Sequence, residues 1–398
     1  MQGVRFAGFG MSVPKWLLPN DMLKQRMQAV REQLRSQGIR IPEAQEKEYV
    51  TTDEWIRERT GVYQRYFCPL DNSVVTSDLA VEAAGNAWTD AYGDGLDVYP
   101  EFIIVATVSP DHFTTPPTAV IVHRKMGVPT MLNGKVWPCV VADVTLACTS
   151  FMVALQYGCM LIETGRCQRG LVIGADRMSS VMSWHRRSPL VILGDGAGAV
   201  VLEATTEAET HNRPHEWLVA ADGGNHGEME NLIKNWAGGS AQPLQPEHLA
   251  PMVDAHLMVM DGNPVFRTVG PLVAKTVIPA ILERSQLTLH DVDVLVLHQA
   301  NQRITDFVAK SLQKANPDVD IRMVTLEDLV GTSILPGNEG KKVVRVFCNI
   351  ERYGNMTSAS VPTALYEARE AGLLPPGSVA LVAAFGGGLS WAATTLRF

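Results

Sequence analysis

The chain is short of several features, and each shortage excludes a class of protein. Its 398 residues carry 34 Lys and Arg against 42 Asp and Glu, a formal net charge of -8 at pH 7. A nucleic acid partner is therefore not expected, because phosphate binding needs a basic face. The six cysteines form no C-x-x-C pair, so we expect free thiols and no metal site. The first residues lack the basic segment and apolar run of a secretory leader, which predicts a cytoplasmic protein.

Long apolar runs are also rare, and neither of the two present is predicted to cross a membrane. Residues 144–162 carry no charge, but they include Thr145 and Gln156 and lie between Asp143 and Glu163. We predict a buried core helix there, although the length alone would suffice for a membrane span. The second run, "SVALVAAFGGGLSWAATTL", is interrupted by three glycines, which predicts two strands joined by a turn. No membrane partner is expected.

One order of elements occurs twice along the chain. In the first copy the strand "VWPCVVADV" leads into a helix at Cys148, and in the second "VVRVFCNIERYGN" leads into a helix at Asn355. Each copy continues through a strand, a glycine turn and another strand. We therefore predict an α/β fold of two pseudo-symmetric halves, residues 1–214 and 215–398, with helices covering the sheets. The two helix starts are expected to face one shared cavity.

A charged segment at about residues 21–50 is expected to be appended to this pattern rather than to belong to its core. Asn20 can cap a helix there, and Gly38 can end it. The apolar positions with helical spacing are Leu23, Met27, Val30 and Leu34.

Cys148 is the first candidate for chemistry, and its own surroundings leave two interpretations open. It follows an apolar strand and precedes a helix, where unpaired N–H groups and the macrodipole favour a thiolate. Free cysteines are also common as small buried core residues. Met152, Leu155 and Cys159 share its helical face, which we expect to point inward. From the local sequence a nucleophile and a packing residue carry equal weight.

Three further features could complete a site around a nucleophile. His298 ends the strand "VDVLVLH", and ligand sites of α/β folds lie at such carboxyl ends, although a satisfied histidine is commoner. Asn355 in "RYGNMTSAS" could equally cap the helix that follows. The glycines of "AAFGGGLSW" form either a plain hairpin turn or a backbone N–H donor for an oxyanion hole with the Cys148 N–H. Together the four features are what acyl transfer through a thioester requires.

Six motifs occur in one order: "TTDEWIRERTGV", "LACTSF", "LGDGAGAVVLE", "HQANQRI", "YGNMTSASVPTAL" and "AAFGGGLSW". They resemble the signatures of the β-ketoacyl-acyl-carrier-protein synthase III family in the thiolase superfamily. The resemblance implies a five-layered αβαβα fold and a homodimer. It implies no cofactor, with thioesters of coenzyme A or of the phosphopantetheine of an acyl carrier protein as substrates.

The resemblance also implies a role for individual residues. Cys148 matches the acylated nucleophile, His298 and Asn355 match its two partners, and Gly387 would share the oxyanion hole with the Cys148 N–H. The positions implied for substrate binding are Trp55, Arg59, Asn263 and Asn301. Those implied for docking the acidic carrier protein are Arg267, Arg303 and Lys310, which could also be solvated surface charges.

The implied reaction has two halves. Cys148 takes an acyl group from a thioester while the oxyanion hole holds the tetrahedral intermediate. A malonyl-type thioester then enters, and His298 and Asn355 hydrogen-bond its thioester oxygen. Loss of carbon dioxide gives an enolate that attacks the acyl-cysteine in a decarboxylative Claisen condensation. Neutral donors suit this task because they stabilise charge that develops in the transition state.

Two segments, at about residues 21–50 and 321–346, are longer than this family usually carries, and the loop "SPDHFTTPPTAV" differs from it. They predict a specialised member with an altered acyl or acceptor pocket. The alternatives are an acyltransferase or a chalcone-synthase-like type III polyketide synthase on the same scaffold. A Cys–His–Asn hydrolase is disfavoured by the flanking motifs, and a catalytically silent partner subunit by the intact Cys148.

Overall fold

Eleven strands form the frame of the molecule. The computed structural model describes residues 3–41, 43–94, 98–184, 186–205, 217–249, 256–329 and 340–398. The strands lie in the order β14-β15-β13-β16-β17-β10-β1-β9-β8-β4-β7. The first half of the chain supplies β1 (Gly3–Ser12), β4 (Phe102–Ala106), β7 (Val140–Val144), β8 (Arg169–Asp176) and β9 (Gly196–Thr205). The second half supplies β10 (Trp217–Asn225), β13 (Val294–Leu297), β14 (Val319–Val324), β15 (Lys342–Phe347), β16 (Val379–Gly386) and β17 (Ser390–Arg397).

The strand order repeats itself about the β1–β10 pair. From β7 inward the neighbours are β4, β8, β9 and β1, and from β15 inward they are β13, β16, β17 and β10. Both series contain two parallel pairs followed by two antiparallel pairs. Strands β7 and β15, which precede Cys148 and Asn355, therefore hold equivalent places. The predicted boundary at 214 and 215 falls outside the described residues.

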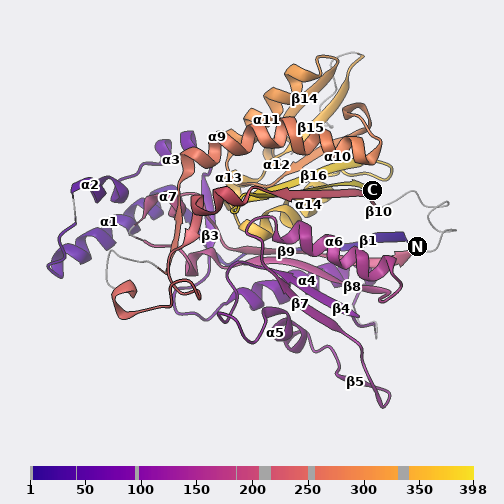
Figure 1. Cartoon of the computed structure of the whole chain (residues 1–398), viewed down its shortest axis with the longest axis horizontal. Helices are drawn as coiled ribbons and strands as arrows, with labels where there is room; N and C mark the ends of the chain where they lie inside the picture. The colour runs from indigo at the N-terminus through magenta and orange to yellow at the C-terminus, as the bar shows by residue number, and fades with distance from the viewer. Residues whose placement is uncertain are drawn as a thin grey trace.

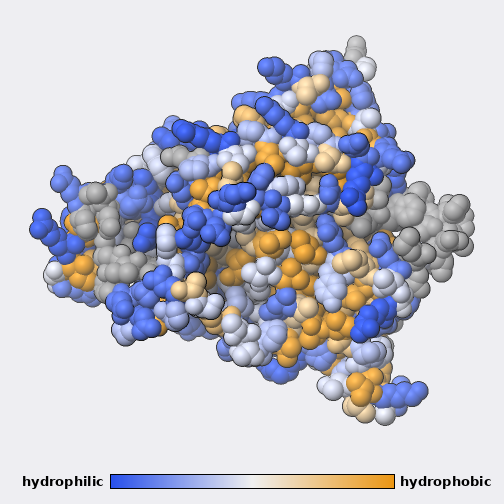
Figure 2. Space-filling model, viewed as in Figure 1, coloured by the Kyte–Doolittle hydropathy of each residue, from blue (hydrophilic) through white to orange (hydrophobic). Residues whose placement is uncertain are grey.

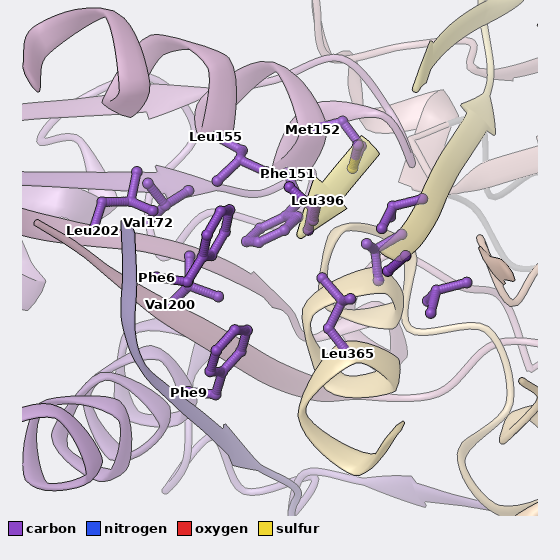
Figure 3. Packing of buried hydrophobic residues seen from close by; sticks show 14 of the residues in the cluster. Phe6, Phe9, Phe151, Met152, Leu155, Val172, Val200, Leu202, Leu365 and Leu396 are labelled. Atoms are coloured by element: carbon purple, nitrogen blue, oxygen red, sulfur yellow. The ribbon is translucent and has the colours of Figure 1, made fainter. Parts of the chain in front are cut away.

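Helices complete five layers, as predicted. One outer layer holds α4 (Thr76–Tyr92) and α5 (Thr118–Lys125), and the other holds α9 (Gly262–Leu272), α10 (Ile278–Ser285) and α11 (Gln302–Ala315). The middle layer holds α6 (Ser150–Glu163) and α14 (Ser360–Glu370), between the two halves of the sheet (Figure 1). Figure 3 shows Phe151, Met152 and Leu155 of α6 packing into the same core as Leu365 of α14. The inward face predicted for α6 is confirmed, since Met152, Leu155 and Cys159 are all buried.

Two glycines let α14 lie close against β8 and β9. A Cβ atom on Gly174 would come within 2.2 Å of the Ser358 carbonyl oxygen, and one on Gly198 within 2.7 Å of the Thr363 nitrogen. Any side chain at these positions would push α14 away from the sheet. The close approach brings the start of α14 to the carboxyl end of β8.

The shorter elements lie around this frame. They are β2 (Trp16–Pro19), β3 (Gln64–Phe67), β5 (Met131–Leu132), β6 (Lys135–Val136), β11 (Ile233–Asn235), β12 (Met258–Met260), α3 (Asp53–Thr60), α7 (Arg187–Leu190), α12 (Leu326–Leu329) and α13 (Ile350–Tyr353). Single 3-10 turns occur at η2 (Met178–Ser180), η3 (Gly227–Leu232), η4 (Pro246–Leu249), η6 (Leu289–Asp291) and η7 (Thr357–Ala359), and a π-helical segment at η5 (Val273–Val277).

One described helix, Pro264–Ser285, is long and apolar enough to cross a membrane by length and composition. It spans α9, η5 and α10. Val269, Val273 and Ile281 on it are fully buried or nearly so, and they pack in the core of the second half. The core helix of a globular domain passes the same test, so the helix is no indication of a membrane span.

The charged segment forms an arm of α1 (Asn20–Ser36), α2 (Glu43–Glu46) and η1 (Lys47–Tyr49) at one side of the molecule (Figure 1). Its outer part has a small core of its own, made by Leu34, Ile41 and Tyr49. The prediction that Asn20 caps α1 is wrong. Its amide instead donates hydrogen bonds to the Asp53 carboxylate and to the Val62 carbonyl, each at 2.8 Å.

Candidate active site

Cys148 lies in a tight turn between β7 and α6. The turn is fixed by Ser150, whose hydroxyl accepts the Leu146 N–H at 2.7 Å and donates to the Ala147 carbonyl at 2.5 Å. Ala147 has a φ of 47°, in the left-handed region that few side chains adopt. The nucleophile candidate therefore lies two residues before the first residue of α6. Its position is held by the hydrogen bonds of Ser150 rather than by its own side chain.

The thiol of Cys148 is neutral at rest. Burial, together with the nearby Asp176 carboxylate, raises the pKa of the Cys148 thiol to about 12, against a partial opposing effect of the backbone. The expected preference of the helix N-terminus for a thiolate is thus outweighed by desolvation. Deprotonation must accompany attack on a substrate rather than precede it.

His298 lies at the end of β13 with its side chain fully buried. Its backbone N–H donates to the Ala383 carbonyl at 2.8 Å, and its ring meets the Phe385 ring edge-on at 5.4 Å. Neither ring nitrogen has a hydrogen-bond partner in the described part of the chain. Burial lowers the pKa of His298 to about 3, so the imidazole is neutral. Buried polar atoms are normally paired, so two free ring nitrogens point to a ligand that supplies the partner.

The backbone of Asn355 forms an isolated β-bridge with Leu193. Its N–H donates to the Ile192 carbonyl at 2.7 Å, and its carbonyl accepts the Gly194 N–H at 3.0 Å. The side-chain oxygen accepts the Thr357 N–H at 2.8 Å. The oxygen thus closes the turn that leads into η7, but Asn355 caps neither η7 nor α14, whose N-cap residues are Met356 and Ala359, so the capping interpretation is wrong. The amide NH2 group remains available as a donor.

Cys148, His298 and Asn355 line one cavity of about 80 Å³, which confirms that the two helix starts face a shared space. The rest of the wall is mainly apolar, with Ile233, Val269, Ile304, Phe385 and Leu389. A wider cavity of about 520 Å³ shares five of its residues and forms the mouth: Ile192, Met260, Gly262, Phe266 and Asn301. A narrow apolar tunnel with polar groups at its end suits a long, thin substrate arm.

The glycine turn after β16 packs against the nucleophile. A Cβ atom on Gly386 would lie 2.7 Å from the Cys148 nitrogen, and one on Gly387 would lie 3.6 Å from the Ala147 Cβ. The turn thus approaches the Cys148 backbone as an oxyanion hole requires. That the Gly387 N–H and the Cys148 N–H together form the oxyanion hole remains a prediction.

The mouth gathers most of the other predicted residues. Trp55 and Arg59 of α3, Asn301 at the start of α11, and Arg267 and Arg303 all line it. Asn301 joins two of these elements, since its amide donates to the Arg59 carbonyl and its oxygen accepts the Arg303 N–H, each at 3.0 Å.

Two predicted residues are not placed at the mouth. Lys310 is exposed on α11, two turns beyond Arg303. Asn263 is the second residue of α9, beside Gly262 of the mouth, and its side chain lies outside what the structure describes.

Two charged residues of the mouth were missed from the sequence. The Arg187 guanidinium lies over the Trp55 ring, 4.2 Å from its centroid, and donates to the Val50 carbonyl at 2.8 Å. Glu48 of the arm also lines the mouth. The only signal for Arg187 is its place in a basic pair after the strand "RGLVIGAD", and Glu48 is one of many charges in its segment. Among the described residues, no group of His, Cys, Asp and Glu side chains could hold a metal ion.

Comparison with known proteins points to one family. Residues 142–223 match the family described as "3-Oxoacyl-[acyl-carrier-protein (ACP)] synthase III", and residues 282–333 and 340–398 match its C-terminal part. A "Beta-ketoacyl-[acyl-carrier-protein] synthase III" from Clostridium perfringens is 31% identical over 403 residues, covering 100% of both chains.

Solved structures agree. The crystal structure of 3-oxoacyl-(acyl carrier protein) synthase III from Pseudomonas aeruginosa PAO1 has a TM-score of 0.73 at 28% identity and covers 100% of this chain and 98% of that one. The priming β-ketosynthase from the R1128 polyketide biosynthetic pathway has a TM-score of 0.72 at 25% identity, covering 100% of this chain and 96% of that one.

Proposed function

Because the chain belongs to the 3-oxoacyl-acyl-carrier-protein synthase III family, it is a condensing enzyme of the ketosynthase III type, and we propose that Cys148 carries the acyl group. The observation that supports this assignment is the shared cavity. It brings together a thiol, an imidazole with two unpartnered nitrogens and an amide donor at the end of a narrow tunnel. No other cysteine lines either the tunnel or the mouth among the described residues.

In the first half-reaction the Cys148 sulfur attacks the carbonyl carbon of an acyl thioester, and the thiol of the carrier leaves. The Cys148 N–H and the Gly387 N–H hold the oxyanion of the tetrahedral intermediate. In the second half-reaction a malonyl-type thioester loses carbon dioxide. His298 and Asn355 stabilise the resulting enolate, which attacks the acyl carbon and releases Cys148. A neutral imidazole, as burial of His298 requires, suits this role as a donor.

The substrates are proposed to be thioesters on coenzyme A or on a carrier protein. Arg59, Arg187, Arg267 and Arg303 surround the mouth and would attract the phosphates of either arm. Arg267 on α9 and Arg303 and Lys310 on α11 are exposed cations at and beside the mouth, and we propose that an acidic carrier protein docks there. The reaction needs no cofactor of its own, and the free cysteines fit a reducing cytoplasm.

Two biosynthetic roles are candidates for the reaction product. The relatives named as 3-oxoacyl-acyl-carrier-protein synthases favour a role in fatty-acid biosynthesis. The similarity to the priming ketosynthase of a polyketide pathway supports a specialised starter as the second candidate.

The test is acylation of the purified protein with a panel of acyl-coenzyme A and acyl-carrier donors, followed by intact-protein mass spectrometry. We expect a gain of one acyl group that Cys148→Ser removes. Cys139→Ser is the matched control, since Cys139 is a half-buried thiol outside the tunnel and should leave acylation unchanged. No mass gain with any donor would contradict the proposed function.

A further inference from the structure

Asp176 is a buried carboxylate at the carboxyl end of β8 that the reaction described above does not use. Its side chain is fully buried, yet in the described part of the chain it forms no ion pair with a basic group. It is satisfied by hydrogen bonds alone. Such a group is costly to bury unless each oxygen is fully bonded, so its partners show what it holds in place.

One oxygen of Asp176 organises the loop that follows β4. It accepts hydrogen bonds from the Thr107 hydroxyl at 3.0 Å, the Val108 N–H at 2.7 Å, and the N–H and hydroxyl of Ser109 at 3.1 and 2.8 Å. Thr107 is in turn bonded to the segment before the nucleophile, since its carbonyl accepts the Thr145 hydroxyl at 2.8 Å. The link to Cys148 is therefore indirect.

The other oxygen holds the turn that follows Asn355. It accepts the Ser358 N–H at 2.9 Å and the Thr357 hydroxyl. Thr357 is a buried, β-branched residue with a φ of 47°, a conformation that costs free energy and persists only where the surroundings enforce it. Asp176 contributes two of the bonds that enforce it.

This strained conformation of Thr357 orients the side-chain amide of Asn355. The Thr357 N–H donates to the side-chain oxygen of Asn355 at 2.8 Å, which fixes which end of the amide faces the tunnel. If Thr357 relaxed to an ordinary conformation, this N–H would turn away and the amide would lose its anchor. Asp176 is thus linked to Asn355 by hydrogen bonds through a single residue, Thr357.

We propose that Asp176 is a positioning residue that sets the orientation of the Asn355 amide and so governs the condensation half-reaction rather than the acylation half-reaction. The proposal rests on the function proposed above. The Asp176 carboxylate also acts on the nucleophile. Its negative charge helps to keep the Cys148 thiol protonated, which disfavours the thiolate.

The test separates the two half-reactions in Asp176→Asn, which keeps the size of the side chain and removes its charge and one acceptor. We expect acylation of Cys148 within about twofold of the wild type. Condensation with a malonyl thioester should fall at least tenfold, towards the ~10²–10³-fold typical of losing one donor to a developing oxyanion. The pH profile of Cys148 alkylation by iodoacetamide should move to lower pH.

Thr357 supplies an independent variant should Asp176→Asn fail to fold. Thr357→Val removes only the hydroxyl bonded to Asp176 and should slow condensation at least tenfold, whereas Thr357→Ser keeps the hydroxyl and should restore it. Asp318→Asn, an exposed carboxylate paired with His290, is the control for the loss of a negative charge.

Condensation at the wild-type rate in Asp176→Asn and Thr357→Val would overturn the proposal. An equal loss of acylation and condensation would also overturn it, since Asp176 would then support the fold alone. Failure of the wild type itself to accept an acyl group would refute the proposed function instead. The alkylation profile would still report whether Asp176 acts on the thiol.

Discussion

At the scale of the residue, the chemistry depends on uncharged groups: burial keeps the Cys148 thiol and the His298 imidazole neutral, and the Asn355 amide does not ionise. Cys148, His298 and Asn355 are all neutral at rest in an apolar tunnel. A neutral site does not have to reorganise water or counter-ions when charge develops on the substrate. The thiol and the imidazole therefore do not form a resting ion pair, which distinguishes this site from nucleophiles that are ionised before the substrate arrives.

The first prediction concerns the division of labour between the nucleophile and the amide. Asn355→Ala should leave acylation of Cys148 intact and lower the rate of condensation by about 10²–10³-fold, as removal of one oxyanion donor does. Asn231→Ala, on the exposed part of η3, is the control. Radiolabelled malonyl thioester reports condensation, and a normal rate in Asn355→Ala would contradict the assigned role.

The second prediction follows from the raised pKa of the Cys148 thiol. The thiolate fraction of a group with a pKa of about 12 rises tenfold with each pH unit across the neutral and mildly alkaline range. Alkylation of Cys148 by iodoacetamide should therefore accelerate continuously from pH 7 to pH 10 without a plateau. His298, with its pKa lowered to about 3, should add no step in this range. A plateau near pH 7 would show that a thiolate exists at rest.

At the scale of the element, the sequence was enough to predict the repeated strands, the core face of α6 and the order of the site residues along the chain. The strands and the core face follow from periodicity and glycine placement, which are local, whereas the site residues were assigned through the motifs that resemble a known family. The partner of Asn20 could not be predicted, because Asp53 and Val62 meet it only after α1 and α3 pack together. Arg187 was missed for the same reason, since its contact with Trp55 joins segments more than a hundred residues apart.

The arm carries the third prediction. Among the described residues that line the mouth, Glu48 is the only acidic one, and it faces the same space as four arginines. A carboxylate there opposes the several phosphates of coenzyme A more than the single phosphodiester of a carrier-bound arm. Glu48→Gln should therefore raise kcat/KM for acyl-coenzyme A by about two- to fivefold at low salt, the size of one screened charge interaction.

The same variant should change kcat/KM for the acyl-carrier donor by less. Glu43→Gln is the matched control, since Glu43 lies in the same arm but does not line the mouth. An equal effect of both substitutions, or an equal effect on both donors, would show that the arm does not discriminate between the two kinds of thioester.

At the scale of the whole molecule, an unpaired edge and an apolar surface lie together. Strand β7 ends the sheet order, and all five of its residues are only half-buried. Leu146, which follows β7, is 41% exposed, and Met160 on α6 is 52% exposed. Figure 2 shows apolar side chains gathered over the region of α6 and β7. An open strand edge beside apolar side chains is a surface that a second copy can cover.

The fourth prediction is that the protein is a homodimer joined along this surface. Met160→Asp places a charge on the exposed side of α6 and should shift the species seen by analytical ultracentrifugation from dimer to monomer. Leu249→Asp, on an exposed leucine of η4, is the control and should leave the dimer intact. A wild-type protein that sediments as a monomer at micromolar concentration would contradict the prediction.

The middle layer has a consequence for the order in which the chain is made. Helix α6 ends at Glu163, but α14, which covers it, begins only at Ser360. A ribosome adding about 5–20 residues per second needs roughly 10 to 40 seconds to cross that interval. Throughout this time α6 can pack on β4 and β8 of its own half, but its apolar side towards α14 has no cover. Synthesis of the enzyme should therefore depend on chaperones that bind apolar surface until the last strands emerge.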